Sequence, residues 1–127
     1  MKITRKEAIE LDAVLANKKT TKLSDEVVFK LIDNKIELAK VAKSMEDARK
    51  IASEECKPEE LKEEGAVATE AQNAKWNVKF GEYMGRYLAE EIDIEIGTLS
   101  KEEYRTIVKE NEMTIGDAAI LSLIRHD

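Results

Sequence analysis

The sequence is poor in the residues that build disulfides, metal sites and rigid turns. Its 127 residues include one cysteine, one histidine, one proline and five glycines. A single cysteine excludes an internal disulfide and suggests a reducing compartment. One histidine and one distant cysteine are too few for a zinc site of the usual ligands. We therefore expect no metal, no cofactor and no covalent crosslink.

Long apolar runs are also absent. No segment approaches the ~18 apolar residues of a membrane-spanning helix, and the first residues lack the apolar run of a signal peptide. These absences predict a cytoplasmic protein without a membrane partner. The net charge of −6 disfavours non-specific binding to nucleic acid.

Charged and apolar residues are both plentiful. Charged residues make up 38% of the chain, against about 25% in typical domains. The apolar fraction of 43% is enough for a core. This composition is typical of long solvated helices, and the length fits one domain, 1–127. The sequence therefore predicts a single, mainly α domain.

Side-chain caps mark the helix starts. Thr4 with Glu7, and Ser100 with Glu103, have the spacing of capping boxes, in which the hydroxyl and the carboxylate each accept a free backbone N–H. Ser24 precedes the longest apolar pattern as a further N-cap. Helices are expected near 5–17, 25–56, 70–91, 101–110 and 115–125.

The long helix has an apolar seam in alternating steps of four and three residues, a heptad pattern. The seam comprises Val27, Leu31, Asn34, Leu38, Val41, Met45, Ala48 and Ala52. A second stripe widens the apolar face and comprises Val28, Ile32, Ala39 and Ala42. A helix of about 32 residues is ~48 Å long, whereas a globule of this chain would be only ~36 Å across. The helix must therefore pack along another long helix, from this chain or from a second copy.

Asn34 is the polar member of the seam. A polar residue in a heptad core often fixes register at a cost in stability. We therefore expect Asn34→Leu to stabilise the fold and to change the association state.

The internal partner of the long helix is expected at 70–91, in a long antiparallel hairpin. Its apolar stripe comprises Ala74, Val78, Gly81, Gly85, Leu88 and Ile92. A glycine inside a helix costs roughly 1 kcal/mol relative to alanine. Gly81 and Gly85 therefore indicate a close approach of two backbones; the alternative is a loosened helix. A mobile connection is expected at 57–69.

One segment has the period of a strand. Residues 92–96 alternate apolar and acidic side chains, which indicates a half-buried strand or an extended crossover. Residues 1–3 are the one other short candidate, so at most a minimal β element is expected.

Aromatic and arginine residues form the one chemically suggestive group. Aromatic faces with guanidinium groups can hold a base and its phosphate. The candidate ligand-binding residues are Tyr83, Arg86, Tyr87 and Arg105. The alternative is that the aromatic residues, which recur at helical spacing, belong to the core. No catalytic residues are identified, and we expect no enzyme.

The order of segments is distinctive. A short helix precedes the long charged segment LSDEVVFKLIDNKIELAKVAKSMEDARKIASEE, a spacer follows, a second helix runs into EIDIEIGTLS, and the chain closes with MTIGDAAILSLI. This layout resembles a family of small, functionally uncharacterised proteins of tailed bacteriophages and prophages. The resemblance covers most of the chain and carries over no functional residues. It implies a late or tail-region role in the host bacterial cytoplasm.

Two functions are consistent with these patterns. The first is a non-enzymatic phage protein acting through helix-mediated association, as a structural or assembly accessory; its partner would be a second copy or another phage or host protein. The alternative is a counter-defence protein that sequesters a nucleotide signal or blocks a host defence protein.

Overall fold

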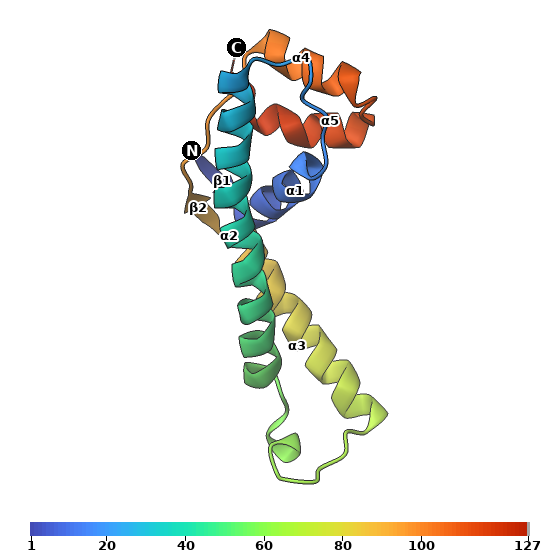
Figure 1. The fold of residues 1–127 in the computed structure, drawn as a ribbon. Coiled ribbons are helices and arrows are strands. Elements are labelled where there is room, and N and C mark those ends of the chain that lie inside the picture. The colour runs from blue at the N-terminus through green and yellow to red at the C-terminus, as the bar shows by residue number, and fades with distance from the viewer. Residues whose placement is uncertain (127) are drawn as a thin grey trace.

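The computed structural model describes residues 1–126 and is mainly helical (Figure 1). Its helices are α1 (Arg5–Leu15), α2 (Asp25–Glu55), α3 (Glu70–Ala89), α4 (Lys101–Glu110) and α5 (Ile115–Leu121). The short 3₁₀ turn η1 (Glu59–Leu61) follows α2, and a second 3₁₀ turn, η2 (Ser122–Ile124), follows α5. The expected mainly helical fold, with a long helix and a minimal sheet, is confirmed.

Local hydrogen bonds explain where the helices begin. The capping boxes at Thr4 and Ser100 both form, and the Ser24 hydroxyl accepts from the N–H of Val27. A third box, between Thr69 and Gln72, begins α3 and was not among the sequence predictions. Each cap satisfies backbone N–H groups that a helix leaves free at its start.

The strands β1 (Lys2–Thr4) and β2 (Glu91–Asp93) form a two-stranded antiparallel sheet. Ile3 lies opposite Ile92 in the register. The N–H of Ile94 extends the pairing by donating to the carbonyl of Met1, at 2.9 Å. The sheet ties the segment after α3 to the chain's first residues.

The head of the molecule consists of β1, β2, α1, α4, α5 and the N-terminal half of α2. Its side chains form one apolar cluster around α1 and α2. The members without exposed area include Leu11, Leu38, Leu99, Ile107, Leu121 and Ile124. Burial of apolar side chains in this cluster stabilises the head.

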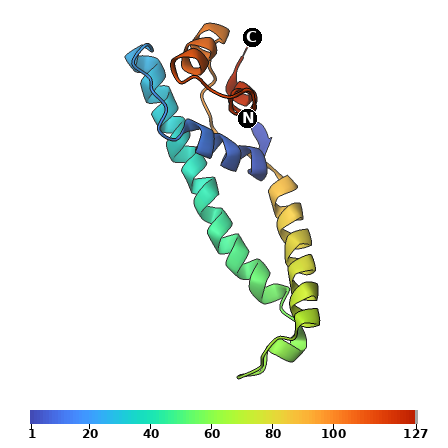
Figure 2. The ribbon, with the colours of Figure 1, turned by 90° about the vertical axis from the view of Figure 1, so that its right-hand side faces the viewer.

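The stalk consists of the C-terminal half of α2 and the antiparallel α3, which extend together from the head (Figures 1 and 2). At the head end, α1 packs against both helices. At the far end, the indole N–H of Trp76 donates to the carbonyl of Ser53, at 2.9 Å. The excess length of α2 is thus partnered within the chain. Residues 57–69 connect the helices, include η1 and bury Leu61; their mobility stays a prediction.

The loop between α1 and α2 is held to α4 through Glu110, and this contact is expected to depend on pH. The Glu110 carboxylate accepts hydrogen bonds from the Thr21 hydroxyl and from the N–H groups of Thr21 and Lys22. The Thr21 hydroxyl is the main cause that lowers the pKa of Glu110 from its ordinary value of 4.5. Because the folded-state pKa is the lower one, the contact is fully present above pH 4.5 and is lost as the pH falls through the folded-state pKa.

Amide hydrogen exchange of Thr21 and Lys22 measures this contact. We expect their protection to fall below pH 4.5 in the wild type, after correction for intrinsic exchange rates. Glu110→Gln should remove most of this pH dependence. An unchanged acid response in the variant would assign the effect to other groups.

Candidate interaction surface

The heptad seam of α2 is its inner face. Val27, Leu31 and Leu38 are buried in the head, at 6%, 8% and 0% exposure. Ala48 and Ala52 are buried in the stalk, while Val41 and Met45 are half-buried. The chain's own elements therefore cover the seam, so the predicted association seam is not a free surface.

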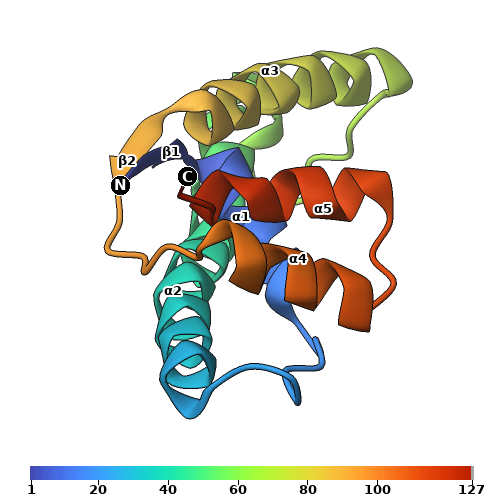
Figure 3. The same cartoon turned by 90° about the horizontal axis from the view of Figure 1, so that it is seen from above.

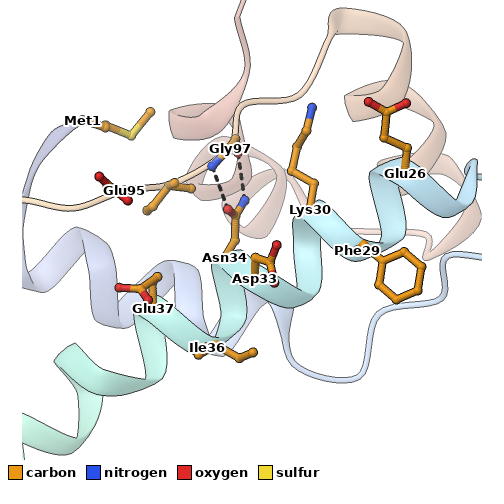
Figure 4. A pocket seen from close by; sticks show the side chains of 11 residues that line it. Met1, Glu26, Phe29, Lys30, Asp33, Asn34, Ile36, Glu37, Glu95 and Gly97 are labelled. Atoms are coloured by element: carbon orange, nitrogen blue, oxygen red, sulfur yellow. Dashed lines mark hydrogen bonds between the residues drawn. The ribbon is translucent and has the colours of Figure 1, made fainter.

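Asn34 lies in the seam, as expected, but its partner is backbone and not another helix. Its side-chain N–H donates to the carbonyl of Gly97 at 2.8 Å, and its side-chain oxygen accepts the Gly97 N–H at 2.7 Å (Figure 4). Asn34 is 2% exposed. These two hydrogen bonds hold the crossover segment 94–100 against α2. Asn34 therefore pairs with backbone of its own chain, and not with a second helix as expected. Because Asn34→Leu would remove both bonds, we now expect it to destabilise the fold and not to stabilise it.

Gly97 lies where a side chain has no room. A Cβ there would be 2.5 Å from Cγ of Lys30 and 2.8 Å from its Cδ. Lys30 is itself held, because its Nζ donates to the carbonyl of Thr98 at 3.1 Å. We expect Gly97→Ala to lower the free energy of unfolding by about 1–3 kcal/mol through overpacking.

Chemical denaturation of a double variant identifies the cause. Lys30→Ala removes the obstructing methylenes, so Gly97→Ala in that background should cost much less than in the wild type. Gly85→Ala is a matched control because open space surrounds Gly85; it should stabilise α3 by up to about 1 kcal/mol. A Gly97→Ala protein as stable as the wild type would contradict the packing described.

The expectation that Gly81 and Gly85 mark a close backbone approach is wrong. Both are exposed, and nothing lies within 4 Å of a Cβ built on either. The face of α3 that is turned inward is instead its aromatic stripe. Its covered members are Trp76, Phe80, Tyr83, Met84, Tyr87 and Leu88. The inner face of α3 thus carries large side chains, Ala48 and Ala52 are buried on the stalk half of α2, and neither glycine of α3 lies at a close contact.

The predicted ligand-binding residues do not converge. Arg105 is on α4, across the head from α3 (Figures 1 and 3). The ring of Tyr87 is covered by the guanidinium of Arg5, 4.1 Å from its centroid. Tyr83 is half-buried and Arg86 is exposed on α3. The structure therefore gives the aromatic side chains mainly a packing role.

An open groove of about 920 Å³ lies between α2 and the crossover segment (Figure 4). Its lining residues are Met1, Glu26, Phe29, Lys30, Asp33, Asn34, Ile36, Glu37, Glu95, Ile96 and Gly97. Acidic side chains outnumber basic ones, and the Lys30 ammonium already binds the Thr98 carbonyl. This lining does not suit a phosphate group, which prefers free guanidinium, ammonium or N–H donors.

The solvent-facing side of α2 carries exposed apolar side chains, and two of them, Phe29 and Ile36, also line this groove. Phe29 is 64% exposed, Ile32 46% and Ile36 53%, and the small Ala39 is also exposed. We call these four residues the outer stripe. Figure 4 draws Phe29 and Ile36 on α2 among the side chains at the open edge of the groove. A contiguous apolar patch on a helix whose inner face is already filled is typical of an interaction surface.

Sequence reasoning placed Ile32 and Ala39 in a stripe with Val28 and Ala42. The structure separates these residues, since Val28 and Ala42 are half-buried. The signal for the outer stripe was the pair Phe29 and Ile36, spaced by seven residues.

Within residues 1–126, no group of three or more histidine, cysteine, aspartate or glutamate residues could hold a metal ion. No helix in that part of the chain is long and apolar enough to cross a membrane. Comparisons of the chain with protein-family models, with curated proteins and with solved structures gave no match.

Proposed function

We propose that this chain is a non-enzymatic protein that acts through helix-mediated protein association, as a structural or assembly accessory of a tailed phage. The observation that carries the proposal is the outer stripe of α2. Its apolar side chains are exposed along a rigid helix, opposite the face that holds the fold together. The phage assignment depends on the resemblance in segment order.

Size-exclusion chromatography with light scattering tests the association. We expect the wild type to exceed the mass of one 14.4 kDa chain as its concentration rises. Ile36→Lys should abolish this increase, because it places a charge within the apolar stripe and alters no core residue. Val78→Lys is the control, since Val78 is 61% exposed on α3, outside the stripe.

Three outcomes would contradict the proposal. Equal weakening of association by Val78→Lys and Ile36→Lys would mean that general hydrophobicity drives it. A strictly monomeric wild type that also binds no phage protein would remove the proposal altogether. Saturable thermal stabilisation by a cyclic nucleotide would favour sequestration of a nucleotide signal instead.

A further inference from the structure

The outer face of α2 has a heptad pattern of its own. Alternating steps of four and three residues keep side chains on one side of a helix. From the start of α2, these steps reach Asp25, Phe29, Ile32, Ile36, Ala39 and Lys43. All six residues are exposed. This face therefore has a complete seam, with an acidic end, four apolar positions and a basic end.

The charges at the two ends define a direction. Asp25 lies at the N-terminal end and Lys43 at the C-terminal end, and neither forms an ion pair with another described residue. A parallel pair of such helices would place like charges together at both ends. An antiparallel pair would place Asp25 of one copy opposite Lys43 of the other, twice, because two-fold symmetry repeats every contact.

The sizes of the apolar side chains agree with the same register. An axis at the level of Asn34 sets Phe29 opposite Ala39 of the second copy, and Ile32 opposite Ile36. A large residue then faces a small one in the outer layers, and two residues of equal size meet in the inner layers. Layers of similar volume allow two helices to pack without voids.

We infer that the outer stripe binds a second copy of this chain, with the two α2 helices antiparallel about a two-fold axis. This inference rests on the proposed function and specifies its partner. The occupant is a second copy because this one surface carries both members of each matching pair: Asp25 and Lys43 match in charge, and Phe29 and Ala39 match in size. Self-complementarity of this kind is the property of a two-fold interface.

Asp33 is unfavourably placed in this arrangement. It is exposed beside the seam and near the axis, so it would lie close to Asp33 of the second copy. Asp33→Asn should therefore lower the dimer dissociation constant several-fold, because like charges across an interface weaken it. An increase in that constant, measured by sedimentation, would contradict the register.

Cysteine crosslinking tests the orientation. Asp25→Cys and Lys43→Cys are made separately in a Cys56→Ser background, which removes the free native thiol. Positions 25 and 43 are ~27 Å apart along α2, and a disulfide requires Cα atoms within ~7 Å. An antiparallel pair should therefore give a covalent dimer when the two variants are mixed and oxidised, and almost none from either variant alone.

The outcomes separate this inference from the proposed function. A covalent dimer from either variant alone would show parallel pairing, which overturns the inference and leaves helix association intact. No covalent dimer in any sample, with Ile36→Lys still abolishing association, would overturn the antiparallel register alone. A wild type that stays monomeric while Ile36→Lys abolishes binding to a phage protein would exclude the second copy as the occupant and retain the proposed function.

A charge exchange provides a second measurement that needs no disulfide. Asp25→Lys or Lys43→Asp alone should raise the dimer dissociation constant by about tenfold, since each change creates two like-charge contacts per dimer. The double variant Asp25→Lys/Lys43→Asp should return most of the affinity. Additive losses in the double variant would contradict the pairing of these residues.

Discussion

Replacing Asn34 by leucine is expected to lower the free energy of unfolding by about 2–4 kcal/mol, because it leaves two backbone groups of Gly97 without a hydrogen-bond partner. The N–H and the carbonyl of Gly97 each lose a partner at 2.7 and 2.8 Å. Leucine fits the apolar seam and favours helix more than asparagine does, so sequence pattern alone predicts the opposite sign. The cost of unpaired, partly buried backbone groups outweighs those gains.

Urea denaturation monitored by circular dichroism measures this change. Asn77→Leu is the matched control, since Asn77 is an exposed asparagine within α3. There the same substitution should be neutral or slightly stabilising. An Asn34→Leu protein at least as stable as the wild type would show that the crossover segment does not depend on the two hydrogen bonds between Asn34 and Gly97.

Leu38→Ala is expected to cost about 2–5 kcal/mol, because it opens a cavity at the base of the head. Leu38 has no exposed area and belongs to the apolar cluster that joins α2 to α1 and α5. The surrounding helices can relax only partly into the vacated space. Such a loss is a large fraction of the stability of a domain of this size.

Ile51→Ala is the control for this substitution. Ile51 is on the same helix and is 52% exposed. The free energy of unfolding should therefore change by less than about 1 kcal/mol at that position. Similar losses at both positions would contradict the account, because an exposed position of the stalk would then contribute as much to stability as the buried core of the head.

The helices could be predicted because their starts are determined locally. A Ser or Thr side chain satisfies backbone groups three residues away, so Thr4, Ser24 and Ser100 are readable without tertiary information. The minimal sheet could be predicted because a strand needs a partner, and residues 1–3 were the one other short segment with which 92–96 could pair. The inner seam of α2 was predicted because its apolar positions continue through the whole helix.

The candidate site was harder to predict because α2 carries heptad patterns on both of its faces. Spacing alone does not say which pattern the rest of the chain covers. The same difficulty affected α3, where the glycine stripe and the aromatic stripe were both plausible inner faces. The role of Asn34 depends on Gly97, which lies 63 residues further along the chain. Such pairings are set by the fold and leave no local signal in the sequence.

The most direct test of association through the outer face of α2 is hydroxyl-radical footprinting across a range of protein concentrations. Phe29, 64% exposed in the single chain, should become protected as concentration rises, together with Ile36. Ile115, 91% exposed on α5, should stay equally reactive throughout. Phe29 that is oxidised to the same extent at every concentration, and also in the presence of co-expressed phage proteins, would contradict association through this face.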